Sequence, residues 1–510
     1  MLFQQLLYDG AHRAPDHPAL RWVDRDRVLT YAEAVEAMER TAAALAGLGV
    51  TRGERVAIFA HNGLDYVTAM FGAWRLGAIA ALVNVAYADT LDYYLADCDP
   101  SVLIYTGDHH PTIEQHRHAL SGIRHLVCLD GPQDGSLVWQ ELLDGAGPPP
   151  DVRVDESDVA HLSYTSGTSG NPKGACLAHE PTLRATRCIA ERLRLSAEDV
   201  TYGPTTLSSS NHLVANLLPG LSRGAEVCLA TAWKGRAGWS DLDDLDATVI
   251  AANPPILTDV LDESRARGRV PGRLRLGLSG GGPVPPELKR GWRGDLGVTL
   301  AESYGMSELG GFFGLGGPEP LPDDALDACG PPLPDKEVRI FDDDGTEVPV
   351  GQLGEIVLRG GFMAGYWRRP DQTAATLRDG WLHSGDLGFI DARGLLHMRG
   401  RLSERVTVAG RHWFPRDVEE ALLAHPEVRQ AALVGLPDAE VGQRPVAFVT
   451  LTGGDGGRPG PDELVAFTVR ALGEGPAGLA VEVVSDLPMT PTGKISKAQL
   501  LARAAAGPPR

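Results

Sequence analysis

The sequence predicts an α/β protein with more than one domain. Its 510 residues exceed what a single small hydrophobic core organises. Near the N-terminus, apolar runs of strand length alternate with segments of helical spacing, which favours a parallel or mixed sheet. From residue 401 onward 12 Lys and Arg stand against 13 Asp and Glu, so nearly all of the net charge of -20 lies earlier, as expected for a separate domain.

Four early segments give this strand and helix pattern. Thr30 and Glu33 are three residues apart and predict a capping box that begins a helix. Residues 55–60 are a compact apolar run, which predicts a buried strand. Residues 63–76 have helical spacing, and residues 78–83 predict the next strand.

Composition and charge exclude several functional classes. A net charge of -20 disfavours nucleic-acid binding, because neutralising phosphates requires a basic surface. The six cysteines have no paired spacing, which disfavours a disulfide framework and a cysteine zinc site. The N-terminus does not resemble a signal peptide, and no apolar stretch reaches the roughly 18 residues of a membrane span. We expect a cytoplasmic monomer or homodimer.

A glycine-rich stretch at residues 164–174 is the strongest local signal. It reads Tyr-Thr-Ser-Gly-Thr-Ser-Gly-Asn-Pro-Lys-Gly. Such a loop can wrap phosphate oxygens with backbone N–H groups and hydroxyls, while Lys173 adds a point charge. A solvent-exposed turn is the alternative, because the same residue types are ordinary in loops. The spacing is not that of a Walker A loop, since Gly174 follows the lysine.

Two further stretches fit a nucleotide. Residues 278–283 place three glycines after an apolar run, where a flat ligand can lie against bare backbone or the chain can form a tight turn. Residues 302–308 read Glu-Ser-Tyr-Gly-Met-Ser-Glu. Tyr304 can offer a ring face to a base, and Glu308 offers the hard oxygens that Mg²⁺ prefers.

The last two stretches lie toward the C-terminus. Residues 381–386, Trp-Leu-His-Ser-Gly-Asp, place a carboxylate at a turn, and residues 488–497 contain a lysine in the context Thr-Pro-Thr-Gly-Lys. Taken singly, such residues more often satisfy their own turn or remain solvated. Taken in order, the stretches resemble the motifs of the adenylate-forming superfamily, which includes acyl-CoA synthetases, adenylation domains of peptide synthetases and luciferases. The resemblance extends over nearly the whole chain.

The resemblance implies a site for ATP and Mg²⁺. The catalytic residues would be Lys494, Glu308 and Thr168, and Glu308 and Thr168 would also hold the metal ion. The nucleotide would be bound by Thr165, Ser166, Gly167, Thr168, Ser169, Gly170, Lys173, Gly280, Gly281, Gly282, Ser303, Tyr304, Gly305, Ser307, Asp386, Arg401 and Lys494.

The resemblance also implies where the acid binds. The pocket would be lined by Ser209, Asn211, His212, Gly281, Gly305 and Gly310. Residues 205–212 depart from the family, which commonly has an aromatic residue or a histidine after a proline there. A pocket for a small or polar acid and an ordinary turn are equally open at this run. No aspartate stands where amino-acid-activating relatives place the partner of the substrate amine, which disfavours that substrate class.

The same resemblance implies a large multi-layer N-terminal domain of mixed β-sheets and helices and a small mobile α+β C-terminal domain, which rotate relative to each other about a hinge. The N-terminal domain would span 1–400, the hinge 401–404 and the C-terminal domain 405–510. Ser403 stands where the family usually has an aspartate or lysine, and a serine can rotate as readily. The loop around Gly410 would enter the active site for thioester formation, with glycine leaving room for the pantetheine arm.

The expected function is activation of a small carboxylic acid by ATP, with pyrophosphate release, followed by thioester formation with CoA. A first alternative is a stand-alone adenylation enzyme that passes the acyl group to a carrier-protein thiol or to a non-thiol acceptor such as an amine. An alternative of another class is a catalytically silent nucleotide-binding scaffold.

Overall fold

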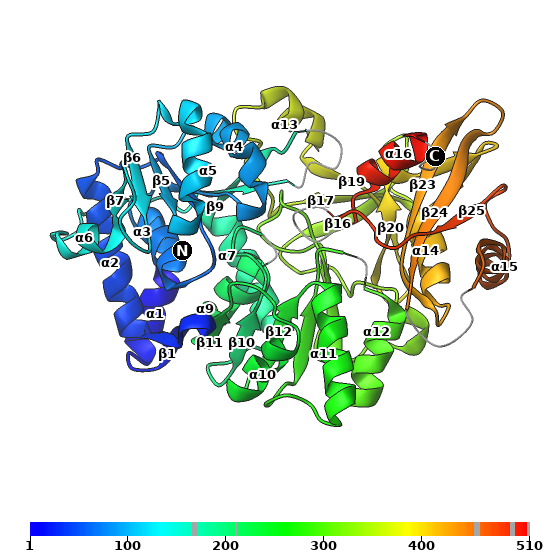
Figure 1. Cartoon of the computed structure of the whole chain (residues 1–510), viewed down its shortest axis with the longest axis horizontal. Helices are drawn as coiled ribbons and strands as arrows, with labels where there is room; N and C mark the ends of the chain where they lie inside the picture. Colours follow the sequence, from blue (N-terminus) through cyan, green and yellow to red (C-terminus); the bar gives the residue numbers. More distant parts are fainter. Residues whose placement is uncertain (166–170, 210–211, 283, 453–458, 490–494, 507–510) are drawn as a thin grey trace.

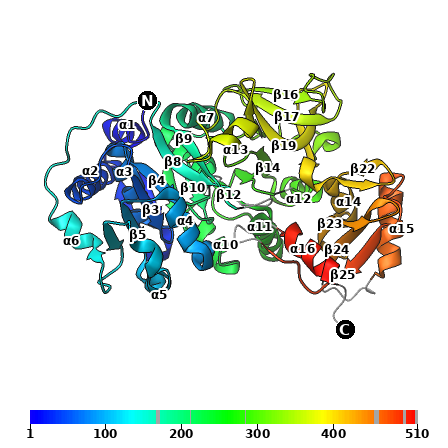
Figure 2. The same ribbon diagram turned by 90° about the horizontal axis from the view of Figure 1, so that it is seen from above.

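The computed structural model describes residues 1–165, 171–209, 212–282, 284–452, 459–489 and 495–506. In this part of the chain the strands form four sheets, with helices packed between and around them (Figures 1 and 2). The predicted α/β class is confirmed. None of the described helices combines the length and apolar character that crossing a membrane requires.

The first sheet is mainly parallel, and its last strand pair, β8 and β9, is antiparallel. Its strands in spatial order are β7 (Leu137–Val138), β6 (His125–Cys128), β5 (Val102–Tyr105), β3 (Arg55–Phe59), β4 (Ile79–Leu82), β8 (Val159–Tyr164) and β9 (Gly174–Ala178). The helices of this region are α1 (Gln5–Arg13), α2 (Tyr31–Gly47), α3 (Leu64–Arg75), α4 (Leu91–Cys98), α5 (His110–Gln115), α6 (Trp139–Asp144) and α7 (His179–Arg192).

The second sheet is parallel in its centre and antiparallel at both edges. Its strands in order are β15 (Gly314–Leu315), β14 (Thr299–Tyr304), β13 (Leu276–Ser279), β12 (Val249–Ala252), β10 (Val200–Gly203), β11 (Glu226–Leu229), β1 (Pro18–Trp22) and β2 (Arg27–Thr30). Its helices are α9 (Leu218–Arg223), α10 (Arg236–Asp244), α11 (Pro254–Arg267) and α12 (Pro286–Gly291).

Two smaller sheets complete the fold. The third contains β16 (Glu337–Phe341), β17 (Gly354–Arg359), β18 (Leu377–Arg378), β19 (Trp381–Ile390) and β20 (Leu396–Arg401), with α13 (Pro370–Thr376). The fourth lies at one end of the molecule, beyond the third (Figure 2), and contains β21 (Val406–Val408), β22 (Arg411–Trp413), β23 (Val428–Asp438), β24 (Gly442–Leu451) and β25 (Ala480–Val483), with α14 (Pro415–Leu423), α15 (Pro461–Leu472) and α16 (Lys497–Ala506).

The alternation of side chains along β3 explains how helices cover both faces of the first sheet. Val56 and Ile58 face the core that contains α3, whereas Ala57 and Phe59 face the core that contains α4. A parallel strand buried on both faces therefore reads as a continuous apolar run. The strand predicted at residues 55–60 is confirmed.

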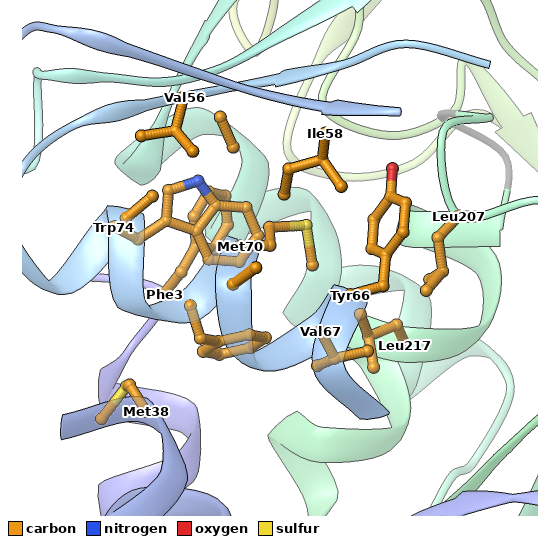
Figure 3. Packing of buried hydrophobic residues seen from close by; sticks show 14 of the residues in the cluster. Phe3, Met38, Val56, Ile58, Tyr66, Val67, Met70, Trp74, Leu207 and Leu217 are labelled. Atoms are coloured by element: carbon orange, nitrogen blue, oxygen red, sulfur yellow. The ribbon is translucent and has the colours of Figure 1, made fainter. Parts of the chain in front are cut away.

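The largest core joins the two large sheets. Trp74 and Met70 of α3 lie against Val56 and Ile58, and Leu217 packs onto the same helix from the second sheet's side (Figure 3). The indole Nε1–H of Trp74 donates to the carbonyl of Ala160 at 2.8 Å, so this large buried ring leaves no polar group unpaired. This shared core holds β8 of the first sheet together with β1 and β11 of the second sheet. The ends of β8 and β14 lead into the site described below.

The other early predictions also hold. Thr30 Oγ1 accepts the backbone N–H of Glu33 at 3.2 Å, and Glu33 Oε2 accepts the N–H of Thr30 at 2.8 Å, so the capping box is present at the start of α2. The helix predicted at 63–76 is α3, and the strand predicted at 78–83 is β4.

Candidate active site

The glycine-rich stretch connects two antiparallel strands, so it is the loop of a hairpin. Thr165 N–H donates to the Lys173 carbonyl at 3.0 Å, and Lys173 N–H donates to Thr165 Oγ1 at 3.1 Å. These two bonds close the base of the loop. Five predicted phosphate-binding residues, Ser166, Gly167, Thr168, Ser169 and Gly170, lie outside the described residues.

Glu308 is held close to the base of this loop. Its carboxylate is buried and accepts the Tyr366 hydroxyl at 2.5 Å. The ammonium of Lys173 lies 4.4 Å from the centre of the Tyr366 ring, so one tyrosine contacts both groups. Burial, with the nearby Glu308 carboxylate, raises the pKa of Tyr366 far above its ordinary value, which keeps the hydroxyl a donor. Ser307 Oγ donates to the Tyr164 carbonyl at 3.3 Å and ties the two segments together.

Glu308, Tyr366 and Lys173 form one polar group of the site, and Asp386, Tyr304 and Arg401 form a second. Asp386 is 3% exposed, and its Oδ2 accepts the Tyr304 hydroxyl at 2.5 Å. Arg401 faces it across the β19–β20 ladder, with Nε 3.4 Å from Asp386 Oδ1. Burial raises the pKa of Asp386, and the Arg401 guanidinium and the Tyr304 hydroxyl oppose that rise. Oδ1 is buried without a hydrogen-bond partner among the described residues, so it is placed to accept a ligand hydroxyl.

Two of the three glycines after β13, Gly281 and Gly282, face open space. Gly281 has φ +81°, and a Cβ placed on Gly281 or Gly282 would meet no atom within 4 Å. Ser303 Oγ donates to the Ser279 carbonyl at 3.0 Å, which holds the ends of β13 and β14 together next to the glycines. Tyr304 stacks one ring face on Phe313, with centroids 4.8 Å apart. The exposed glycine backbone is a suitable surface for a flat base.

The two glycines predicted to line the acid pocket after β14 are close-packed. A Cβ on Gly305 would lie 2.8 Å from the Gly311 carbonyl oxygen, and one on Gly310 would lie 2.3 Å from Thr182 Oγ1 in α7. These positions therefore admit only glycine for packing reasons. Their contact with the acid stays a prediction.

His212 has an internal role in the 205–212 segment. It is buried, its Nδ1 lies 2.5 Å from the Thr205 carbonyl oxygen, and Asn216 Nδ2 lies 3.3 Å from its Nε2. Burial lowers the pKa of His212 to about 4, so the ring is neutral at pH 7 and Nδ1 carries the hydrogen. Ser209 is half-buried in the same turn, and Asn211 lies outside the described residues.

Asn62 is a residue that the sequence did not single out. Its Nδ2 donates to the carbonyls of Thr205 at 2.7 Å and Ala230 at 2.8 Å, and its Oδ1 accepts the Leu207 N–H at 2.8 Å. One buried amide thus positions the segment expected to line the acid pocket. Asn62 is 145 residues from its partner Leu207, so no local sequence pattern indicates this contact.

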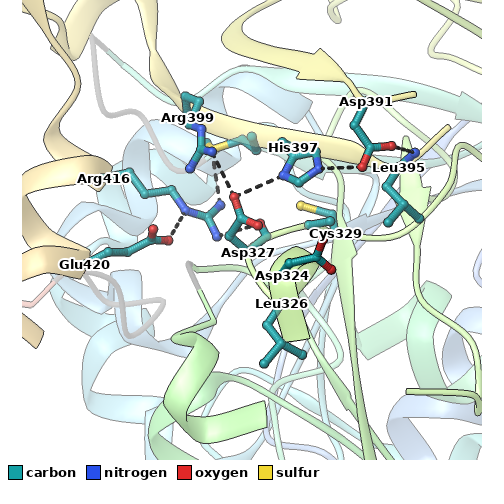
Figure 4. Close-up of polar contacts among 12 residues, drawn as sticks. Asp324, Leu326, Asp327, Cys329, Asp391, Leu395, His397, Arg399, Arg416 and Glu420 are labelled. Carbon is teal, nitrogen blue, oxygen red and sulfur yellow. Dashed lines mark hydrogen bonds and ion pairs between the residues drawn. The ribbon is translucent and has the colours of Figure 1, made fainter. Parts of the chain in front are cut away.

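The C-terminal sheet docks onto the N-terminal body through α14. Arg416 is 4% exposed and donates to Glu420 at 2.6 Å and to the Asp327 carbonyl at 3.3 Å, while Arg399 reaches the Asp327 carboxylate at 2.8 Å (Figure 4). Arg416 also lies 3.9 Å from Glu302 in β14. The interface between the C-terminal and N-terminal parts of the chain therefore reaches Glu302, two residues before Tyr304 in β14.

The predicted hinge and thiol-entry residues are both exposed. Ser403 lies in a short turn between β20 and β21. Gly410, at φ +78°, lies at the turn of the β21–β22 hairpin, and a Cβ on it would meet no atom within 4 Å. Lys494 lies outside the described residues. Three residues later, Lys497 bonds Glu404 and Glu419, each at 2.9 Å.

Comparisons with known proteins identify the family of this chain. The sequence model of the AMP-binding enzyme family matches residues 7–367, and that of the AMP-binding enzyme C-terminal domain matches 417–494. A feruloyl-CoA synthase from Amycolatopsis sp. is 33% identical and aligns over 93% of this chain and 94% of its own length.

Solved structures show the same architecture. The anthranilate CoA ligase AuaEII, in complex with anthranoyl-AMP, superposes with a TM-score of 0.90 at 27% identity and covers 99% of this chain and 98% of its own. The amide bond synthetase McbA from Marinactinospora thermotolerans has a TM-score of 0.88 at 26% identity, covering 98% and 99%.

Proposed function

Because this chain belongs to the AMP-binding enzyme family, we propose that it is an acyl- or aryl-CoA synthetase. As an adenylate-forming ligase it activates a carboxylic acid in an ATP-dependent reaction. The proposed position of the site depends on one observation. The segment 304–308 joins both polar groups, because Tyr304 binds Asp386 at one end and Glu308 binds Tyr366 beneath Lys173 at the other.

The nucleoside of ATP is proposed to bind at the Asp386 end of this segment. Asp386 Oδ1, which has no described hydrogen-bond partner, would accept a ribose hydroxyl, and Arg401 would contact the ribose or the adjacent phosphate. The base would lie on the bare backbone of Gly281 and Gly282, next to Tyr304. A carboxylate is the natural partner of vicinal hydroxyls because it accepts two hydrogen bonds at once.

The phosphates are proposed to bind at the hairpin end. Lys173 supplies a positive charge there, and Thr165 supplies a hydroxyl hydrogen, since its oxygen already accepts the Lys173 N–H. Glu308 fits a magnesium ion, because it is a buried carboxylate beside the expected phosphate position and offers only oxygen ligands. The bound ion would screen the phosphate charge.

The chemistry joins two anions, so the site must neutralise charge and align the attack. A carboxylate oxygen of the acid attacks the α-phosphorus, a new C–O–P anhydride forms, and the bond to pyrophosphate breaks. We assign Lys494 to bridge the acid and the α-phosphate, while Lys173 and Thr165 hold the departing pyrophosphate. Asn62 and His212 keep the 205–207 segment fixed, so that the acid is held in one orientation.

Thioester formation is proposed to need a second arrangement of the domains. With Gly410 exposed and Arg416 docked beside Glu302, the observed arrangement is assigned to adenylate formation. Rotation at Ser403 would withdraw Lys494 and bring Gly410 toward the adenylate, where the CoA thiolate attacks the acyl carbon and AMP departs.

The acid is proposed to be aromatic, because feruloyl-CoA synthase and anthranilate CoA ligase, both named for aromatic acids, align over nearly the whole chain. A second candidate function is amide formation from the adenylate, favoured by the structural similarity to an amide bond synthetase and by Ser403 in place of a charged hinge residue. A carrier-protein thiol is the third candidate acceptor of the acyl group. A silent scaffold is not supported, since the aligned relatives are ligases.

A pyrophosphate-release assay distinguishes these acceptors. Aromatic, aliphatic, amino and inorganic acids would be tested with Mg-ATP, with and without CoA. The proposal predicts release with a subset of aromatic acids and, when CoA is present, a free CoA thioester. Pyrophosphate release without thioester, together with an amide when an amine is added, would favour the second candidate.

A further inference from the structure

A group of histidine and aspartate side chains lies apart from the adenylation residues. Asp92 is in the first turn of α4, and His116 and His118 are in the turn that follows α5. One ligand atom from each of the three lies within 4.8 Å of the others. His116 Nδ1 is 3.6 Å from Asp92 Oδ1, and His118 Nε2 is 3.8 Å from Asp92 Oδ2.

His116 is the unusual member of this group. Its side chain is only 7% exposed, and neither ring nitrogen has a hydrogen-bond partner among the described residues. A buried polar group normally has a partner, because leaving it unsatisfied costs about 1–3 kcal/mol. An ion bound between His116 and Asp92 would satisfy Nδ1, the ring nitrogen that faces the carboxylate, and would account for a buried imidazole beside Asp92.

The spacing of the ligand atoms also fits an ion. Zinc bonds of about 2.0–2.2 Å in tetrahedral geometry separate the ligand atoms by roughly 3.3–3.5 Å. The two separations from Asp92, one from each carboxylate oxygen, are close to that range, and among the described residues no hydrogen bond of these three side chains must break. The three ligand atoms lie within 4.8 Å of one another, so binding requires them to close by up to about 1 Å. Asp92 and His118 are 43% and 69% exposed, so both side chains can move by this amount, and solvent can fill the fourth position.

We propose that Asp92, His116 and His118 bind a divalent transition-metal ion of the zinc class. Two imidazole nitrogens and one carboxylate suit Zn²⁺, Co²⁺ or Ni²⁺, whereas Mg²⁺ prefers oxygen ligands alone. The ion links α4 to the turn after α5. The neighbouring Tyr93 donates from the same helix to the Pro172 carbonyl at 2.5 Å, so the ion also steadies the helix that supports the phosphate hairpin.

A second group of this kind among the described residues provides the matched control. It consists of His61, Asp108 and His109, in which His61 Nε2 already shares a 2.8 Å hydrogen bond with Asp108. His61 is partly exposed, as His118 is, so replacing either leaves the core intact. The variants are therefore His118→Ala and Asp92→Asn against His61→Ala.

The experiment uses the full chain without a histidine tag, stripped of metal with EDTA. Co²⁺ is titrated while its visible absorption is recorded, and Zn²⁺ is titrated by calorimetry. We expect one equivalent to bind the wild type and His61→Ala, and binding at least about tenfold weaker in His118→Ala and Asp92→Asn. Zn²⁺ should raise Tm more in the wild type and His61→Ala than in His118→Ala and Asp92→Asn, and all four should share one Tm in EDTA. No binding by the wild type, equal binding by His118→Ala, or loss in His61→Ala would overturn the proposal.

Discussion

Arg416 of α14 lies 3.9 Å from Glu302, two residues before Tyr304 in β14. Glu302 also accepts the buried Lys289 ammonium at 2.6 Å, so two cations from different domains share one buried carboxylate. Because Lys289 belongs to the same N-terminal part as Glu302, this carboxylate would keep a partner in either of the two proposed domain arrangements. We therefore expect that removal of the Arg416 guanidinium shifts the equilibrium between the two proposed domain arrangements.

We predict that Arg416→Gln slows adenylate formation more than thioester formation. It removes the contacts with the Asp327 carbonyl and Glu302, which belong to the docked arrangement, as well as the bond to Glu420 within α14, at a cost of about 1–3 kcal/mol to the free energy of unfolding. ATP–pyrophosphate exchange and thioester formation from presynthesised acyl-adenylate measure the two halves separately. Arg293→Gln, which breaks an exposed ion pair with Asp323, is the control and should change neither rate. Equal slowing of both halves in Arg416→Gln would count against the docking role.

Tyr304→Phe tests the ribose end of the site. The variant keeps the ring and removes the hydroxyl that donates to Asp386, so the carboxylate loses a fixed orientation. A hydrogen bond to a charged group contributes about 1.5–3 kcal/mol, and we expect the KM for ATP to rise by roughly tenfold or more. Tyr66→Phe removes a buried hydroxyl that has no partner among the described residues and should leave the KM unchanged. A normal KM in Tyr304→Phe would place the ribose elsewhere.

Glu308→Gln tests the magnesium end. The substitution preserves shape and the bond from Tyr366 but removes the charge that a hard cation requires. We expect pyrophosphate exchange to fall by about 10²–10³-fold and the Mg²⁺ concentration for half-maximal rate to rise. Tyr366→Phe should have a much smaller effect, because it leaves the carboxylate in place. A Glu308→Gln enzyme with an unchanged Mg²⁺ requirement would exclude the metal role.

Three buried histidines make stability fall in mild acid. Burial lowers the pKa of His161 to about 3 and the pKa values of His179 and His212 to about 4, against an ordinary 6.5. The unfolded chain binds more protons than the folded one between pH 6.5 and 4, so the stability present above pH 6.5 is lost as pH falls.

The size of this loss can be measured by urea unfolding between pH 7.5 and 5. Each histidine contributes up to about 1.4 kcal/mol per pH unit below 6.5. His161→Gln should flatten the slope by about one third, while replacement of the exposed His12 by Gln should leave it unchanged. A pH-independent free energy of unfolding over this range would refute the burial argument.

Local signals in the sequence were enough for the elements that depend on neighbouring residues. The capping box of Thr30 and Glu33 and the apolar strand at residues 55–60 are set by contacts within one turn or by burial on both faces of a sheet. The pairing of Tyr304 with Asp386 agrees with two stretches that the resemblance had assigned to one nucleotide.

Contacts between distant segments could not be predicted in the same way. Tyr366 is 58 residues from Glu308, and Arg416 reaches Glu302 from another domain. Tyrosine and arginine are ordinary surface or core residues in sequence, and only the packed fold shows which carboxylates they contact. The sequence also does not show why residues 305 and 310 are glycines. In the structure Phe312 and Thr182 lie so close to them that a larger side chain would not fit.

The most direct measurement of the central proposal compares the two half-reactions of Lys494→Ala. The lysine is assigned to the charge-neutralising step of adenylate formation and is withdrawn before thiol attack. ATP–pyrophosphate exchange should nearly disappear, while thioester formation from presynthesised acyl-adenylate and CoA should persist, and Arg503→Ala, which removes an exposed cation from α16, should retain both. Equal loss of both half-reactions in Lys494→Ala, or exchange at the wild-type rate, would contradict a site that alternates between two domain arrangements.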